Sequence, residues 1–112
     1  MPKVARSSDI KKDVGRRLRA ARSIVYDSSD GCARALDIPR NTWRNYESGE
    51  RYPDPAHIVR FCDQTGFTTD FIYRGKFRGI AEDVQIRLAA EYPGLVDEAP
   101  DVGHSAKDAV RV

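Results

Sequence analysis

Apolar residues recur at the three- and four-residue spacing of an α-helix in six short segments, and almost none alternate as in a β-strand. The predicted helices cover residues 10–22, 29–36, 40–48, 56–65, 71–74 and 80–92. Residues that begin or end helices lie between them, among them Asp27-Ser28-Ser29-Asp30, Gly49 and Asp54-Pro55. The sequence therefore predicts an all-α fold of short helices joined by tight turns.

The length and the charge distribution narrow the classes of function. A chain of 112 residues is too short for an α/β barrel or a two-domain enzyme. Residues 1–60 hold 13 Lys and Arg against 8 Asp and Glu, whereas residues 61–112 hold 6 against 9. A basic first half indicates a polyanionic partner, although a solvated basic surface would give the same balance.

Membrane proteins, secreted scaffolds and common catalytic sites find no support in the sequence. No apolar run approaches the ~18 residues of a membrane span, and no apolar stretch follows the basic N-terminus, so we expect a cytoplasmic protein. Cys32 and Cys62 fall on apolar helix faces and are expected to be small buried residues. We expect no catalysis, no metal and no cofactor, because phosphate-binding loops, catalytic triads and ligand clusters are missing from the sequence.

The segment 40–48 divides its side chains between two opposite arcs. At about 100° per residue, one arc carries two arginines and two asparagines, namely Arg40, Asn41, Arg44 and Asn45. The opposite arc carries Trp43 and Tyr46, which should be buried. Arg and Asn have the best bidentate geometry for the edges of guanine and adenine, and Asn is otherwise a poor helix former. The pattern predicts a helix that reads bases in the major groove, although an ordinary amphipathic helix would also expose Arg and Asn.

Motifs spread over residues 10–75 strengthen this interpretation. They are Arg17-Leu-Arg-Ala-Ala-Arg22, Cys32-Ala-Arg-Ala-Leu-Asp-Ile38, Thr42-Trp-Arg-Asn-Tyr-Glu-Ser-Gly49, Pro53 and Phe67-Thr-Thr-Asp-Phe-Ile-Tyr-Arg-Gly75. Together they resemble the Cro and phage-repressor helix-turn-helix family, also called the XRE family. The most specific part is Tyr46-Glu47-Ser48-Gly49, in register with Ala33 and Ile38. The resemblance implies a compact five-helix domain that binds half-sites on double-stranded DNA as a homodimer.

The resemblance also implies roles for single residues. The positions that read bases are those of the polar arc: Arg40, Asn41, Arg44 and Asn45. Ser29 matches a position that hydrogen-bonds a phosphate, and Thr42 matches a small residue close to the DNA backbone. We also expect phosphate contacts from Arg51 and from the arginines of the first helix. Arg22 and Glu47 match a buried ion pair that ties the first helix to the third.

Two residues of the predicted turn depart from the family pattern. Asp37 stands where the family usually has glycine, and Pro39 stands where a Ser or Thr cap is common. Asp tolerates a left-handed backbone better than most residues, so we expect the turn to survive. Ile38 and Trp43 could form a hydrophobic staple across the start of the third helix.

The predicted organisation has four parts. Residues 1–9 form a basic arm, 10–75 the DNA-binding domain, and 76–96 an extension with a helix at about 80–92. Residues 97–112 are expected to be a disordered tail, because Pro, Gly, Asp and Glu dominate there without a helical period.

The sequence thus predicts a transcriptional regulator, expected to be a repressor, that binds a near-palindromic operator as a homodimer on the nucleoid. The apolar residues 71–73 and the helix 80–92 are predicted to form the two-fold interface. Two alternatives stay open at this point. One is an antitoxin-like protein that binds DNA and masks a partner protein through residues 80–112. The other is a protein-interaction adaptor, or an enzyme, that uses the same fold as a scaffold.

Overall fold

A long first helix forms the centre of the fold. The computed structural model describes residues 7–96, so most of the predicted arm and the whole predicted tail lie outside the described residues. The helices are α1 (Ser7–Val25), α2 (Ser29–Leu36), α3 (Arg40–Ser48), α4 (Pro55–Thr65), α5 (Thr69–Arg74) and α6 (Glu82–Glu91). The all-α prediction is confirmed, because the described residues contain helices and no strand.

Local capping sets most of the helix boundaries. α2 and α3 have the predicted bounds, and α4 begins at Pro55 after the N-cap Asp54, whose carboxylate accepts from the Ala56 N–H at 2.8 Å. α5 begins two residues earlier than predicted, because the Thr68 hydroxyl caps it. α6 begins two residues later, because the N–H of Ile80 is bonded to the Phe77 carbonyl in a turn.

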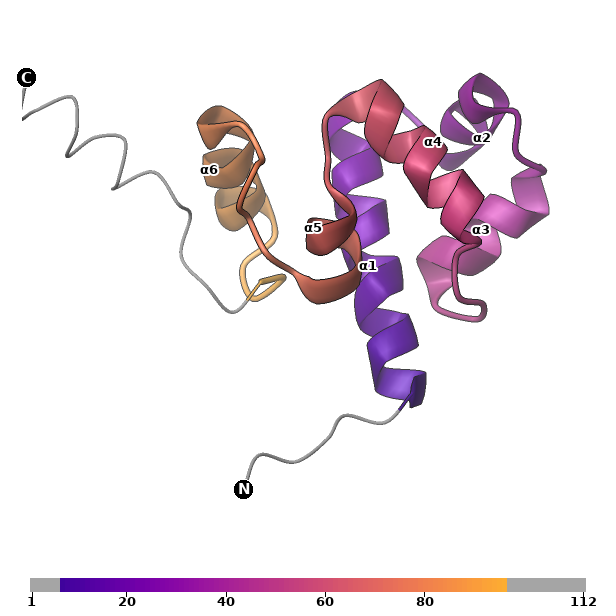
Figure 1. Ribbon diagram of the computed structural model, residues 1–112, viewed down its shortest axis with the longest axis horizontal. Coiled ribbons are helices and arrows are strands. Elements are labelled where there is room, and N and C mark those ends of the chain that lie inside the picture. The colour runs from indigo at the N-terminus through magenta and orange to yellow at the C-terminus, as the bar shows by residue number, and fades with distance from the viewer. Residues whose placement is uncertain (1–6, 97–112) are drawn as a thin grey trace, which may run out of the picture.

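The helices pack around α1, which contacts α2, α3 and α5. In Figure 1, α2, α3 and α4 lie on one side of α1, whereas α6 lies on the other. A row of aromatic rings crosses the core with centroids 5.5–6.1 Å apart, in the order Trp43, Phe61, Phe67, Phe71 and Phe77. The core therefore runs continuously from α3 to the segment that follows α5.

Gly15 allows an unusually close approach of α1 to α3. A Cβ atom at this position would lie 2.7 Å from the Tyr46 carbonyl oxygen and 2.8 Å from that of Glu47. Real Cβ atoms essentially never show contacts this short. The missing side chain of Gly15 therefore sets how close the C-terminal half of α3 can lie to α1.

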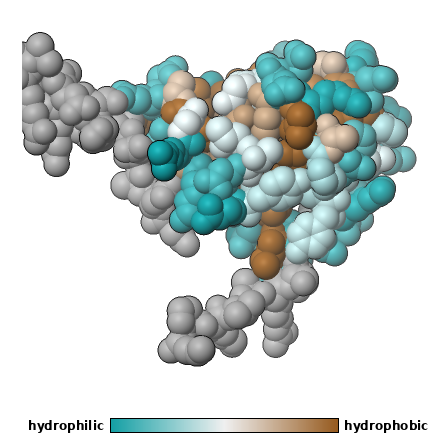
Figure 2. Space-filling view, in the orientation of Figure 1, coloured by the Kyte–Doolittle hydropathy of each residue, from teal (hydrophilic) through white to brown (hydrophobic). Residues whose placement is uncertain are grey.

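The predicted two-fold interface on α5 and α6 is wrong in its apolar residues. Phe71 and Ile72 are 0% exposed, because α5 packs against α1 and α4. Ile80 and Leu88 are also buried, and Ile86 is the large apolar side chain that α6 leaves exposed. On the face drawn in Figure 2, hydrophobic residues reach the surface only in small separate patches. Much of the apolar surface assigned to a second protomer is thus covered within the chain itself, whereas Tyr73, Val84 and Tyr92 are half-buried.

The structure also bears on the membrane prediction. Across residues 7–96, no helix has both the length and the apolar character that crossing a membrane would require.

Candidate nucleic-acid interface

Hydrogen bonds from the Asp37 N–H and from the Arg60 guanidinium hold the turn between α2 and α3. Asp37 adopts the left-handed conformation, with φ 56° and ψ 51°, and its N–H donates to the Arg34 carbonyl at 3.2 Å. The Arg60 guanidinium on α4 donates to the carbonyls of Leu36 at 2.7 Å and of Asp37 at 3.1 Å. The turn is therefore retained with aspartate in the place of glycine, as expected, and Arg60 of α4 holds it by hydrogen bonds.

α3 exposes one polar arc and buries the opposite one. Trp43 and Tyr46 are 0% exposed. Three residues of the polar arc are exposed and the fourth is half-buried: Arg40, Asn41 and Arg44, then Asn45. Because Pro39 precedes the helix, no side chain caps its first N–H groups. The structure thus brings the predicted base-reading residues together on one face, and their contacts with DNA stay a prediction.

The carboxylate of Glu47 joins three helices behind this face. Two Arg22 nitrogens, Nε and Nη2 on α1, each donate to it at 3.0 Å, and the Ser29 hydroxyl on α2 donates at 2.8 Å. The indole Nε1 of Trp43 donates at 2.5 Å. The Glu47 side chain is 7% exposed and that of Arg22 is 11% exposed. Hydrogen bonding to Glu47 raises the pKa of Arg22 above its ordinary value, although desolvation opposes this.

This network fixes the orientation of α3, because one buried carboxylate holds donors from α1, α2 and α3 itself. It also occupies Ser29, whose only hydroxyl proton is donated to Glu47. A hydrogen bond from Ser29 to a phosphate, as predicted, would require that proton to turn away from Glu47. The Ser29 contact with the DNA backbone stays a prediction on that condition.

Asp30, which the sequence pattern marks only as a residue that begins a helix, lies in the first turn of α2 and pairs with the start of α3. Its carboxylate lies 3.0 Å from Nη2 of Arg44 and 3.7 Å from Nη1 of Arg40. These partners are fourteen and ten residues away along the chain, so no local sequence pattern pairs them. Asp30 therefore holds the two exposed guanidinium groups toward one point and offsets part of their charge.

The residues predicted to meet phosphates fall into two groups. Arg51 is exposed and Thr42 is half-buried near the polar arc. Of the arginines of the first helix, Arg22 forms the predicted ion pair with Glu47, and Arg17 is also held inside the fold, so neither is placed to meet a phosphate. Arg17 is 9% exposed and donates to the carbonyls of Ile72 at 2.9 Å and of Tyr73 at 3.0 Å. Its guanidinium therefore hydrogen-bonds carbonyls near the C-terminal end of α5 instead of reaching outward.

Arg16 and Arg19 are the arginines of α1 that remain exposed. Arg19 and Arg44 border a shallow cleft of about 190 Å³ between α1 and α3, which the Glu47 network also lines. Two cations therefore flank a polar cleft beside the exposed face of α3, which is called the reading face.

The remaining candidate groups serve the core. Cys32 is fully buried and Cys62 half-buried, and both are free thiols. Desolvation by burial is the main cause that raises the pKa of Cys32 to about 12 and that of Cys62 to about 11. The His57 Nδ1 atom is hydrogen-bonded to the buried Tyr46 hydroxyl at 2.7 Å, so this ring is anchored inward and is not a free surface histidine.

Comparison with known proteins gives one match. Residues 13–70 match the family model described as a helix-turn-helix domain, a span that covers just over half of the chain. It includes all of α2, α3 and α4 together with most of α1. No curated protein and no solved structure matched the chain.

Proposed function

The chain belongs to the helix-turn-helix domain family, and on this premise we propose that it is a sequence-specific transcriptional repressor of the Cro and phage-repressor type. α3 is the recognition helix, whose N-terminal half enters the major groove of DNA. The protein acts by binding, without catalysis, in the cytoplasm and on the nucleoid.

The observation that carries this proposal is the exposed face of α3 on a rigid support. Arg40, Asn41 and Arg44 project from the N-terminal half of the helix, where a recognition helix meets base edges. Behind them, Trp43 and the Glu47 carboxylate hold the helix to α1 and α2. Base reading by bidentate hydrogen bonds needs such rigidity, because a helix that shifts by about 1 Å loses its register with the base edges.

Phosphate contacts supply the sequence-independent part of binding. The proposed donors are Arg51 and Thr42 beside α3, Ser29 at the start of α2, and the exposed Arg16 and Arg19 of α1. Each cation that neutralises a phosphate releases a counterion, so the affinity should fall steeply with salt. These contacts position the domain, whereas the bases select the sequence.

The operator is proposed to be near-palindromic and bound by a homodimer, with recognition helices about 34 Å apart. The dimer surface cannot use Phe71, Ile72, Ile80 or Leu88, since these residues are buried within the chain. The antitoxin-like alternative depends on a partner surface within residues 80–112, whereas the adaptor alternative uses the fold itself as a scaffold. On α6 and at its C-cap, Leu88 is buried, Val84 and Tyr92 are half-buried and Ile86 is exposed, so little apolar surface is left there for a partner.

The proposal is tested by selecting bound duplexes from random DNA and then measuring affinity for the selected operator and for random DNA. Asn41→Ala removes no charge and should cost about 1–3 kcal/mol on the operator and almost nothing on random DNA. Gln64→Ala removes an exposed amide on α4 and is the matched control, which should change neither affinity.

Arg51→Ala provides the complementary measurement. It should weaken both duplexes alike and lower the salt dependence by about one ion. Equal losses of operator and random-DNA binding in Asn41→Ala would show that α3 does not read the sequence. Failure to recover any preferred duplex would remove the basis for sequence-specific repression.

A further inference from the structure

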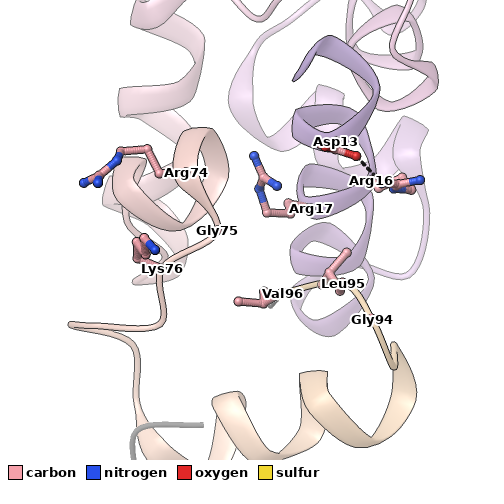
Figure 3. Close-up of a pocket in the computed structure, with 9 residues that line it drawn as sticks. All are labelled: Asp13, Arg16, Arg17, Arg74, Gly75, Lys76, Gly94, Leu95 and Val96. Atoms are coloured by element: carbon pink, nitrogen blue, oxygen red, sulfur yellow. Dashed lines mark hydrogen bonds and ion pairs between the residues drawn. The ribbon is translucent and has the colours of Figure 1, made fainter. Parts of the chain in front are cut away.

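A basic cavity of about 270 Å³ lies between α1, the C-terminal end of α5 and the turn that follows α6. None of the residues that line it belongs to α2 or α3, so it is separate from the reading face. In Figure 3 the Arg17 guanidinium points into the space between α1 and the segment 74–76, with Val96 drawn below it. The cavity thus lies between α1 and α5 on one side and the extension 76–96 on the other.

The charge in this cavity is strongly one-sided. Among residues 7–96, four cationic side chains line it, namely Arg16, Arg17, Arg74 and Lys76, against the carboxylate of Asp13. Asp13 is paired with Arg16. Because this pair is largely exposed, it contributes little and exchanges easily for another partner. The lining residues that the structure describes therefore carry three more positive than negative charges.

The individual cations differ in how firmly they are held. Arg74 lies 2.9 Å from Asp70 in an exposed pair on its own helix, whereas Lys76 has no carboxylate partner among residues 7–96. Arg17 is the fixed member, because its bonds to two carbonyls of α5 hold it in a site that is 9% exposed. A charge fixed in a poorly solvated site acts more strongly on a ligand than the same charge in open solvent.

Gly75 packs directly beside the fixed charge. A Cβ atom at this residue would stand 3.4 Å from Nη1 of Arg17, so any side chain there would pack against the guanidinium. Gly75 also adopts φ 71°, which favours glycine. The turn from α5 into the extension therefore covers this side of Arg17 with backbone alone.

We propose that this cavity binds a small dianion, either a phosphate monoester or a dicarboxylate. Guanidinium groups recognise both chemistries by paired hydrogen bonds, and a lysine adds a mobile point charge. The volume lies just below the ~300–1,000 Å³ of sites for drug-sized ligands, which favours a compact ligand. Such a ligand would bridge α1 to residues 94–96 and stabilise the extension on the core. This site does not depend on the proposed base reading.

The test is a calorimetric titration of the full chain in chloride buffer with inorganic phosphate and, separately, with succinate. We expect saturable binding of at least one probe, and the probe that binds identifies the ligand chemistry. Lys76→Ala should weaken that binding about tenfold, which is the loss of one charged contact. Arg78→Ala removes an exposed cation two residues away, outside the cavity, and should change the affinity no more than about twofold.

Three results would overturn the proposal. The first is absence of saturation with both probes at millimolar concentrations. The second is an equal loss in Lys76→Ala and Arg78→Ala, because that would reflect net charge alone. The third is a Lys76→Ala variant that loses duplex DNA affinity by the same factor as phosphate affinity, because the cavity would then serve the DNA backbone.

Discussion

Replacing Gly15 by alanine should destabilise the protein, although alanine is the better helix former. The added Cβ would meet two carbonyl oxygens of α3, those of Tyr46 and Glu47, at 2.7 and 2.8 Å. It would also lie 3.0 Å from the backbone nitrogen of Gly49. All three atoms are backbone, so no side-chain rotation can relieve the contacts and the two helices must separate.

Two opposing contributions decide the sign of the effect. Alanine gains about 1 kcal/mol over glycine within a helix. Inserting a methyl group into a tightly packed contact typically costs about 1–3 kcal/mol, occasionally more. The cost here lies at the upper end, because moving α3 also disturbs the Arg22–Glu47 hydrogen bonds. We therefore expect a net loss of about 1–2 kcal/mol, from a total that is typically ~5–15 kcal/mol.

Thermal unfolding followed by circular dichroism measures this change, with Gly31→Ala as the matched control. A Cβ at Gly31 in α2 would meet only the Ser28 hydroxyl, at 3.1 Å, so helix propensity should dominate there. Gly31→Ala should raise the free energy of unfolding by up to about 1 kcal/mol. Each kcal/mol shifts Tm by about 4–8 °C in a domain of this size. A rise in Tm for both variants would refute the close approach of α1 to α3.

Two further predictions concern buried groups. Glu47→Ala leaves Arg22 buried without its partner and should lower the free energy of unfolding in urea by about 3–5 kcal/mol. Glu50→Ala changes an exposed residue and should lower it little. Equal effects of the two substitutions would contradict the role of Glu47. Burial raises the pKa of Cys32 from 9.0 to about 12, so between these pH values the unfolded chain loses a proton that the folded chain keeps, and stability falls as pH rises. At about pH 10.5 this loss of stability should amount to about 2 kcal/mol. The free energy of unfolding, measured at about pH 8 and pH 10.5, should therefore fall less in Cys32→Ala than in the unchanged protein. An equal fall in both proteins would show that the thiol is not buried as described.

Local signals made much of the fold predictable. The Asp54-Pro55 start of α4 and the Gly49 end of α3 depend on residues within one helical turn, and both lie where the sequence placed them. The two arcs of α3 were also readable, because burial of Trp43 and Tyr46 follows from helical spacing alone. Such features need no knowledge of which elements meet in space.

Contacts between distant segments were not readable in the same way. In the sequence, nothing distinguishes Gly15 from any other glycine within a helix, because its role depends on the close packing of α3 against it. Asp30 counts as a capping residue in the sequence, and its pairing with Arg44 depends on how α2 crosses α3. The burial of Phe71 and Ile72 depends likewise on α1 and α4 covering both sides of a six-residue helix. Predicting the candidate site therefore required the packing of helices as well as their sequences.

The indole of Trp43 makes the support of α3 optically observable. The chain has one tryptophan, which is 0% exposed and donates its N–H to the Glu47 carboxylate. All tryptophan emission thus originates at the junction of α1, α2 and α3, with a buried charge beside the fluorophore. Opening of that junction would expose the ring to water and shift the emission to longer wavelength. Fluorescence therefore reports on the seating of one helix, without any attached label.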